Sequence, residues 1–269
     1  MNKPLISVLI VNFNTVDFIE LSLFALKKLT KNPYRVFIAD NGSEISDFLK
    51  LQKIVATSPE VSLKRFETDL RGSLAHGTAL NALTEKVNTP FFSILDADAT
   101  WLIKDWDEIL INRLKGQTKV IGTQAPPGKP QDFPLMFASL FETETFRTLH
   151  IDFRPKDIAQ KQDTGFEMRE KYLAAGFRGE NIDFFNTRNF HIGSFPNVTC
   201  AEYYLSGEPH IFASHFGRGS TLGEAKYRKG WKKYFYSLPL LGNNLLKAHG
   251  SKEKTEWISI CRKLIQDQI

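Results

Sequence analysis

The chain has 269 residues, of which 42% are hydrophobic, 24% are charged and 12% are aromatic. These proportions are typical of a globular protein that buries a substantial core, and they exclude a disordered chain. The only cysteines are Cys200 and Cys261, which excludes a disulfide scaffold. The formal charge of +5 suits phosphate-bearing partners without identifying one.

Apolar strands alternate with amphipathic helices through the first half of the chain. The predicted strands cover residues 5–11, 34–40, 61–67, 91–95 and 119–123, and the predicted helices cover residues 18–29, 46–55, 72–87 and 109–114. Asp17 with Glu20, and Asp105 with Glu108, match capping boxes at helix starts. Such alternation indicates βαβ units in a mainly parallel sheet, whose ligands bind at the carboxyl ends of the strands.

Polar side chains stand at the ends of several predicted strands. Asn12 follows the first strand, Asp40 and Asn41 end the second, and Asp96 and Asp98 follow the fourth. Because the carboxyl ends of parallel strands share one edge of a sheet, we expect side-chain oxygens to collect at that edge.

The pattern becomes less regular after residue 123, beginning with a loop rich in Pro and Gly. A helix is predicted over residues 164–176, with Thr164 and Glu167 as a capping box and Gly176 as its stop. We interpret residues 210–220 as a strand that runs into a Gly-rich loop.

The C-terminal part is basic and aromatic. Residues 226–233 contain five Lys or Arg residues, interleaved with Tyr227 and Trp231. Such a segment suits peripheral contact with an anionic membrane surface, and the alternative is a helix that packs its aromatic side chains onto the rest of the chain. No nucleic-acid recognition module is visible. Neither a secretory signal nor ~18 consecutive apolar residues occur, so we expect a cytoplasmic location, with any membrane contact at the inner face.

The stretch "SILDADAT" places Asp96 and Asp98 at the end of a buried strand and allows three interpretations. Two carboxylates two residues apart on one strand face the same side, so they can direct oxygens to a metal ion that binds a diphosphate. The same letters match a haloacid-dehalogenase-type phosphatase, in which the first Asp is the nucleophile. The third interpretation is a turn and helix cap without chemistry.

Six segments, taken in order, resemble family 2 glycosyltransferases of the GT-A fold. They are "ISVLIVNFNT", "VFIADNGS", "RGSLAHGTALNAL", "FFSILDADA", "QDTGFEMREKYLAAGFR" and "SHFGRGS", which together span roughly residues 4–220. The resemblance implies a Rossmann-like mixed, mainly parallel sheet flanked by helices. It implies a GT-A domain over residues 1–222, with a nucleotide-sugar half (1–123) and a less regular acceptor half (124–222). Residues 223–269 would form a C-terminal helical extension.

The resemblance also assigns roles to individual residues. It places Val11, Phe13, Asp40, Arg71, Asp96, Arg218 and Ser220 at the nucleotide and its phosphates. Asp98 and His215 would bind Mn²⁺ or Mg²⁺, which neutralises charge on a leaving diphosphate. Asp163 would be the base that removes the proton of the acceptor hydroxyl, with Asp152 and Asp157 as nearby alternatives.

The function implied is an inverting transfer of a sugar from a nucleotide-diphosphate donor to a hydroxyl of a glycan or a lipid-linked glycan. Two alternatives stay open at this point. One is the phosphatase, and the other is a module that binds the nucleotide sugar without turnover.

Overall fold

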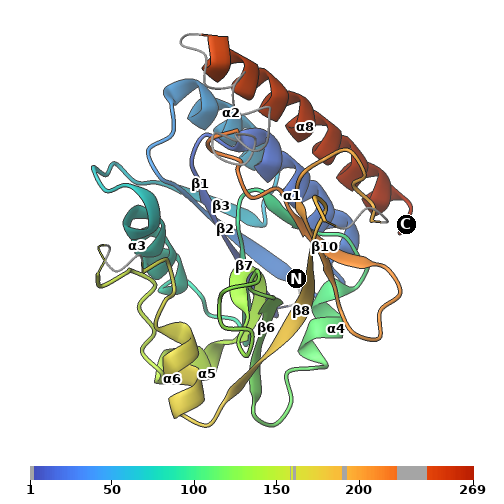
Figure 1. The fold of residues 1–269 in the computed structure, drawn as a ribbon. Coiled ribbons are helices and arrows are strands. Elements are labelled where there is room, and N and C mark those ends of the chain that lie inside the picture. Colours follow the sequence, from blue (N-terminus) through green and yellow to red (C-terminus); the bar gives the residue numbers. More distant parts are fainter. Residues whose placement is uncertain (1–2, 158, 160–161, 190–192, 223–240) are drawn as a thin grey trace.

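The strands of the structure include those predicted from the first half of the sequence. The structure is a computed structural model that describes residues 3–157, 159, 162–189, 193–222 and 241–269. Its strands are β1 (Ile6–Asn12), β2 (Tyr34–Asp40), β3 (Val61–Arg65), β4 (Phe91–Leu95), β5 (Ala99–Trp101), β6 (Thr118–Thr123), β7 (Leu135–Glu142), β8 (Arg178–Asn186), β9 (Ala201–Tyr204) and β10 (Ile211–His215). Within the described ranges they form a 10-stranded sheet in the order β3-β2-β1-β4-β7-β6-β8-β9-β10-β5 (Figure 1).

The sheet is mixed, and its parallel pairs are concentrated in the first half of the chain. β1 pairs in parallel with both β2 and β4, and β2 pairs in parallel with β3. β7 runs antiparallel between β4 and β6, while β8 is parallel to β6. The remaining pairs, β8 with β9, β9 with β10 and β10 with β5, are antiparallel. The last strand, β10, therefore lies beside β5, the strand that follows β4 in the chain.

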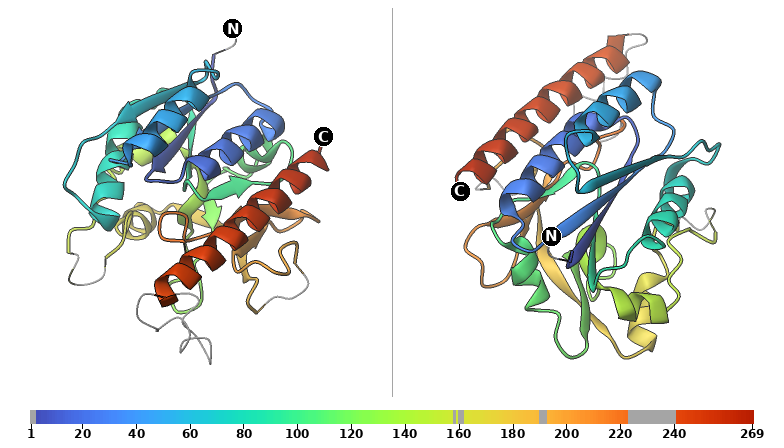
Figure 2. Two further views of the ribbon diagram at one scale, coloured as in Figure 1. Left: turned by 90° about the horizontal axis from the view of Figure 1, so that it is seen from above. Right: turned by 180° about the vertical axis from the view of Figure 1, so that it is seen from behind.

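Helices cover both faces of the sheet. They are α1 (Val16–Leu29), α2 (Ile45–Val55), α3 (Gly72–Thr84), α4 (Trp106–Ile111), α5 (Thr143–Thr148), α6 (Met168–Ala174) and α8 (Leu241–Gln266). α1, α2, α4 and α8 pack on one face, and α3, α5 and α6 pack on the other (Figures 1 and 2). The alternation along β1 supplies both cores, since Ile6, Val8 and Ile10 belong to one and Leu9 to the other.

The long helix α8 lies along α1 (Figure 2). Trp257, Cys261 and Ile265 of α8 are buried in the same core as β1 and α1. The Trp257 ring lies 5.6 Å from the ring of Phe18 on α1. The described part of the C-terminal segment is thus packed on the sheet domain.

The first predicted capping box is wrong, because α1 begins one residue before Asp17. α1 begins after Thr15, and no side chain caps it. Asp17 instead lies 2.5 Å from Lys254 of α8, and Glu20 lies 3.2 Å from Arg262. The two acidic residues bind a helix that is distant in sequence.

The second predicted capping box is present only in position. Asp105 is the residue before α4, but its φ of 57° is left-handed and its side chain caps nothing. Glu108 pairs with Lys31 at 2.7 Å instead.

The third predicted capping box is wrong because the helix starts later. α6 begins at Met168, and residues 164–167 form turns in which Gly165 has a φ of 73°. The Oγ1 of Thr164 donates to the carbonyl of Ser73 rather than capping a helix. The predicted stop is confirmed, since α6 ends at Ala174 and Gly176 adopts a φ of 78°.

Within the described part of the chain, no helix is both long enough and apolar enough to cross a membrane. The basic segment predicted to contact a membrane surface or to pack on the domain falls in residues 223–240, outside the described residues.

Candidate active site

The predicted metal ligands Asp98 and His215 lie together with Asp96, predicted at the nucleotide, near the carboxyl end of β4. Asp96 and Asp98 follow that strand, and His215 ends β10, which pairs with β5 so that His215 lies opposite Ala99. The Nε2 atom of His215 is 3.1 Å from Oδ1 of Asp98 and 3.8 Å from Oδ2 of Asp96. One ligand atom of each residue lies within 4.8 Å of the other two. The antiparallel return of β10 therefore completes the cluster.

Asp98 is also held by two backbone amides. The N–H groups of Arg218 and Gly219 donate to its Oδ2 at 2.8 and 2.7 Å. A Cβ atom on Gly219 would lie 2.8 Å from the Cβ of Asp98, so glycine is needed for this close approach. Burial raises the pKa of Asp98, but the charge and hydrogen bond of His215 and the two amides outweigh it and hold the pKa well below its usual value.

Asp96 has a different environment. Its Oδ1 is buried and accepts no hydrogen bond from any described residue, and the Nε2 of His76 lies 3.9 Å away. Burial raises the pKa of Asp96 to about 6, although the charges of His76 and His215 lower it. A buried carboxylate oxygen without a donor, beside an ionised carboxylate, is an arrangement that a cation stabilises.

A first cavity of about 670 Å³ opens over this cluster, a volume in the range of ligand sites. The residues of the predicted nucleotide site that line it are Val11, Phe13, Arg71, Asp96, Arg218 and Ser220. Phe13 is 42% exposed, so its ring is open to a ligand. The lining of the cavity thus includes both an exposed aromatic ring and the carboxylates of Asp96 and Asp98.

Asp40, predicted to contact the base, is not among the residues that line this cavity. Its side chain is fully buried, and its Oδ1 accepts a hydrogen bond from Asn12 at 2.8 Å. Its Oδ2 lies 3.5 Å from Arg65 and 3.4 Å from the N–H of Ser43. These contacts hold the turn after β2, and the next residue, Asn41, lines the cavity instead.

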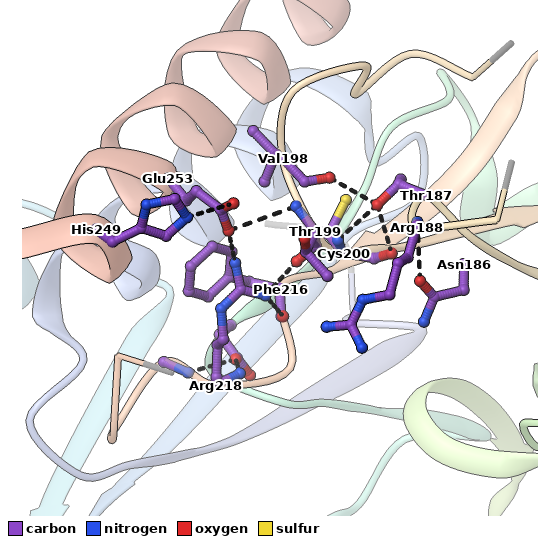
Figure 3. Close-up of polar contacts among 12 residues, drawn as sticks. Asn186, Thr187, Arg188, Val198, Thr199, Cys200, Phe216, Arg218, His249 and Glu253 are labelled. Atoms are coloured by element: carbon purple, nitrogen blue, oxygen red, sulfur yellow. Dashed lines mark hydrogen bonds and ion pairs between the residues drawn. The ribbon is translucent and has the colours of Figure 1, made fainter. Parts of the chain in front are cut away.

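The two arginines predicted at the phosphates differ in orientation. Arg71 is exposed, and its Nη1 donates to the carbonyls of Thr68 and Leu70 at 3.0 and 2.9 Å. The guanidinium of Arg218 is buried and forms an ion pair with Glu253 of α8 (Figure 3). Arg218 therefore contacts Asp98 through its backbone, while its side chain reaches α8.

A second cavity of about 640 Å³ contains Asp163. Oδ1 of Asp163 accepts hydrogen bonds from Ser73 Oγ at 2.6 Å and from the N–H of Thr164 at 2.8 Å. No described residue donates to its Oδ2. The predicted alternatives, Asp152 and Asp157, are not among the described residues that line this cavity.

The two cavities share Gly72, His76, Asp96 and Phe137. His76 stands between their acidic groups, with Nε2 3.9 Å from Asp96 and Nδ1 3.5 Å from the hydroxyl of Thr164. The ring of Phe137 lies 4.5 Å from that of His215. The acidic cluster and Asp163 thus line two different cavities that meet at these shared residues.

Sequence reasoning did not find Ser73, His76 or Phe137. Ser73 and His76 lie three residues apart in the predicted helix, so they share a face just after Arg71, and this spacing was a usable signal. Phe137 belongs to β7, a strand that the sequence pattern did not predict, so nothing placed it near the site.

The family model described as Glycosyl transferase family 2 matches residues 7–177, more than half of the chain. The chain belongs to glycosyl transferase family 2. This result confirms the resemblance found in the sequence. No curated protein sequence matches the chain.

The family 2 fold is also found among solved structures. The mannosyltransferase PcManGT from Pyrobaculum calidifontis, in complex with GDP-Man and Mn²⁺, aligns with a TM-score of 0.54 and 19% identity over 67% of this chain and 55% of its own. TarS from S. aureus aligns with a TM-score of 0.52 and 16% identity over 66% of this chain and 35% of its own. The chain therefore spans about half of the first protein and about a third of the second. These likenesses show the GT-A fold predicted from the sequence.

The residues of this family 2 chain fit a divalent cation. Two carboxylates and an imidazole lie within reach of one ion, and Mn²⁺ accepts both oxygen and nitrogen ligands. The unpaired Oδ1 of Asp96 adds an oxygen that the protein itself does not satisfy. Membership of the family argues against the phosphatase, and so does Asp98, which is held ionised and could not readily serve as an acid.

Proposed function

We propose that the protein is an inverting, metal-dependent glycosyltransferase that moves a sugar from a nucleoside-diphosphate donor to a hydroxyl of a glycan or lipid-linked glycan. The observation that carries this proposal is the junction of the two cavities. One cavity holds the cluster of Asp96, Asp98 and His215, and the other holds the open carboxylate oxygen of Asp163.

The donor occupies the first cavity in this proposal. The exposed ring of Phe13 offers a stacking surface for the base, with Val11 and Arg71 beside it. Mn²⁺ or Mg²⁺, held by Asp98 and His215 with Asp96 adjacent, supplies charge neutralisation for the leaving diphosphate. The Mn²⁺ and GDP-Man in the complex of PcManGT support this assignment through the shared fold.

The acceptor occupies the second cavity. Ser73 and the N–H of Thr164 hold Oδ1 of Asp163, which leaves Oδ2 to take the proton of the acceptor hydroxyl as it attacks. In this proposal the acceptor hydroxyl attacks from the side opposite the diphosphate, because the acceptor and the diphosphate occupy different cavities that adjoin at shared residues. A single displacement from that side inverts the anomeric carbon.

A thermal-shift panel tests the donor side. UDP, GDP and TDP are each added with and without Mn²⁺ to the wild type and to Asp98→Ala. A ligand present at about 100 times its Kd stabilises the native state by about 2.7 kcal/mol, which is readily seen. We expect one nucleotide to stabilise the wild type only with Mn²⁺, and Asp98→Ala to lose that shift. Absence of a shift with every nucleotide would overturn the proposal.

Turnover separates the enzyme from a module that only binds. The nucleotide that shifts the melting temperature is supplied as its common sugar conjugates, together with free glycans or with lipid-linked glycans in detergent. Release of nucleoside diphosphate that depends on one acceptor set supports transfer and identifies the acceptor class. Binding without release in any arm would instead support the non-catalytic alternative.

A further inference from the structure

Arg218 is a buried cation whose backbone N–H donates to Asp98 of the candidate metal site. Its side chain is 3% exposed, and that of its partner Glu253 is 9% exposed. Glu253 lies on α8, beyond the residues 7–177 that match the family model. The pair joins the loop after β10 to the C-terminal helix (Figure 3).

The guanidinium fixes the loop that carries it. Nη1 of Arg218 donates to the carbonyl of Phe216 at 3.1 Å and to the carbonyl of Thr199. Its Cζ lies 3.9 Å from the centre of the Phe216 ring. Nη2 of Arg218 binds Oε2 of Glu253, which also accepts the N–H of Thr199 at 3.4 Å. One carboxylate of α8 therefore holds both the loop after β10 and the segment before β9.

The loop held in this way supplies the amides that bind the metal ligand. The N–H groups of Arg218 and Gly219 both donate to Oδ2 of Asp98, and this leaves Oδ1 facing His215. A planar guanidinium with several donors in a fixed fork restrains the backbone that it binds more strongly than a flexible ammonium does. Because these two N–H groups belong to Arg218 and its neighbour Gly219, the contact of Glu253 with the Arg218 side chain also restrains the carboxylate of Asp98.

We infer that Glu253 is a positioning residue of the metal site, which acts through Arg218 on the amides that orient Asp98, so that α8 belongs to the catalytic unit. The inference rests on the proposed function only in taking Asp98 as a metal ligand. Groups that orient metal ligands commonly change metal affinity about 10–100-fold when they are altered.

Glu253→Gln tests the inference, because glutamine keeps the size and one acceptor oxygen of glutamate but removes its charge. The free Mn²⁺ signal in electron paramagnetic resonance gives the Kd for Mn²⁺ alone, and again with UDP or GDP present. We expect the Kd of Glu253→Gln to rise about 10-fold. The matched control is Lys254→Met, which removes the ion pair with Asp17 from the same helix and leaves the loop contacts intact. Its Kd is expected to equal that of the wild type.

Hydrogen exchange provides a second readout that needs no metal. In Glu253→Gln we expect the amides of residues 216–220 to exchange faster, while those of α8 keep their wild-type rates. Faster exchange throughout α8 would show that Glu253 only docks the helix and would overturn the inference. If Glu253→Gln does not fold, Arg218→Lys replaces it, because lysine keeps the cation and the backbone N–H but loses the fork.

The outcomes distinguish this inference from the proposed function. If the wild type binds Mn²⁺ and Glu253→Gln binds it equally well, only the positioning role fails. If the wild type binds no Mn²⁺ with or without nucleotide, the proposed metal dependence fails, and the positioning role fails with it.

Discussion

Asp163 uses one carboxylate oxygen for two hydrogen bonds and leaves the other open to the second cavity. Asp163→Asn should keep the contacts of Ser73 and Thr164, because the amide oxygen still accepts them. An amide cannot take up the proton of the acceptor hydroxyl, so we expect kcat for sugar transfer to fall about 10²–10⁴-fold. Donor affinity, measured by calorimetry, should not change.

Asp157→Asn is the matched control for this prediction. Asp157 lies in the same segment but is not among the described residues that line the second cavity. We expect its kcat and donor affinity to equal those of the wild type. A wild-type rate in Asp163→Asn would show that another group acts as the base.

The residues of the site differ in how far the sequence could place them. Asp96 and Asp98 follow an uninterrupted apolar strand, so their position at the edge of the sheet followed from local pattern alone. Asp40 ends an equally clear strand, yet its carboxylate is turned to Arg65 and Asn12 and does not line the cavity. Nothing local distinguishes the two cases, because the difference depends on a cation from another strand.

At the scale of elements, the sequence predicted the strands that alternate with helices, and it missed β7, which is apolar but follows β6 without a helix between them. β1 and β4 are short, apolar and buried, so the sequence predicted both of them. β8 (Arg178–Asn186) begins with the polar stretch RGEN, contains no long apolar run and is largely exposed or half-buried, and it was missed. The antiparallel half of the sheet depends on such strands, which have no helix between them to mark their limits. The sequence therefore indicated the strands of residues 1–123 well and those of residues 124–222 poorly.

The turn before α6 is fixed by a buried carboxylate, Glu167. Its Oε1 accepts the N–H of Asp152 at 2.7 Å and lies 2.5 Å from Lys171, while its Oε2 lies 2.9 Å from Lys156. Burial raises the pKa of Glu167, but these partners outweigh it and hold the pKa below its ordinary value. A lowered folded-state pKa contributes stability above the unfolded-state value of about 4.3, and this contribution is lost as the pH falls through the folded-state pKa.

Glu167→Gln should therefore lower the melting temperature at neutral pH and flatten its dependence on acid. Circular dichroism melts from about pH 7 down to about pH 3, spanning the range in which carboxylates titrate, measure both effects. Glu170→Gln, at an exposed position in the first turn of α6, should follow the wild-type curve. Parallel curves for wild type and Glu167→Gln would contradict the assigned role of Glu167.

At the scale of the whole molecule, the site depends on three parts of the chain that meet at one edge. The parallel half supplies Asp96 and Asp98, and the antiparallel half returns β10 so that His215 lies beside them. α8 contacts both ends of the segment around His215. Glu253 binds Arg218, and the indole N–H of Trp257 donates to Ser214 at 2.9 Å. The division at residue 222 that the sequence suggested would separate α8 from the residues it contacts.

Trp257→Ala tests whether α8 folds as one unit with the sheet. Trp257 is 1% exposed, and its ring lies 5.6 Å from Phe18 and 5.9 Å from Phe216. Removal of a buried aromatic side chain costs about 3–5 kcal/mol, so we expect a loss of that size in one cooperative transition. Guanidinium unfolding followed by far-ultraviolet circular dichroism measures it without relying on tryptophan fluorescence. Leu245→Ala, at a 47% exposed position of α8, should change stability by less than about 0.5 kcal/mol. A separate early transition in Trp257→Ala would mean that α8 unfolds on its own, and the C-terminal helix would then be an appendage of the domain.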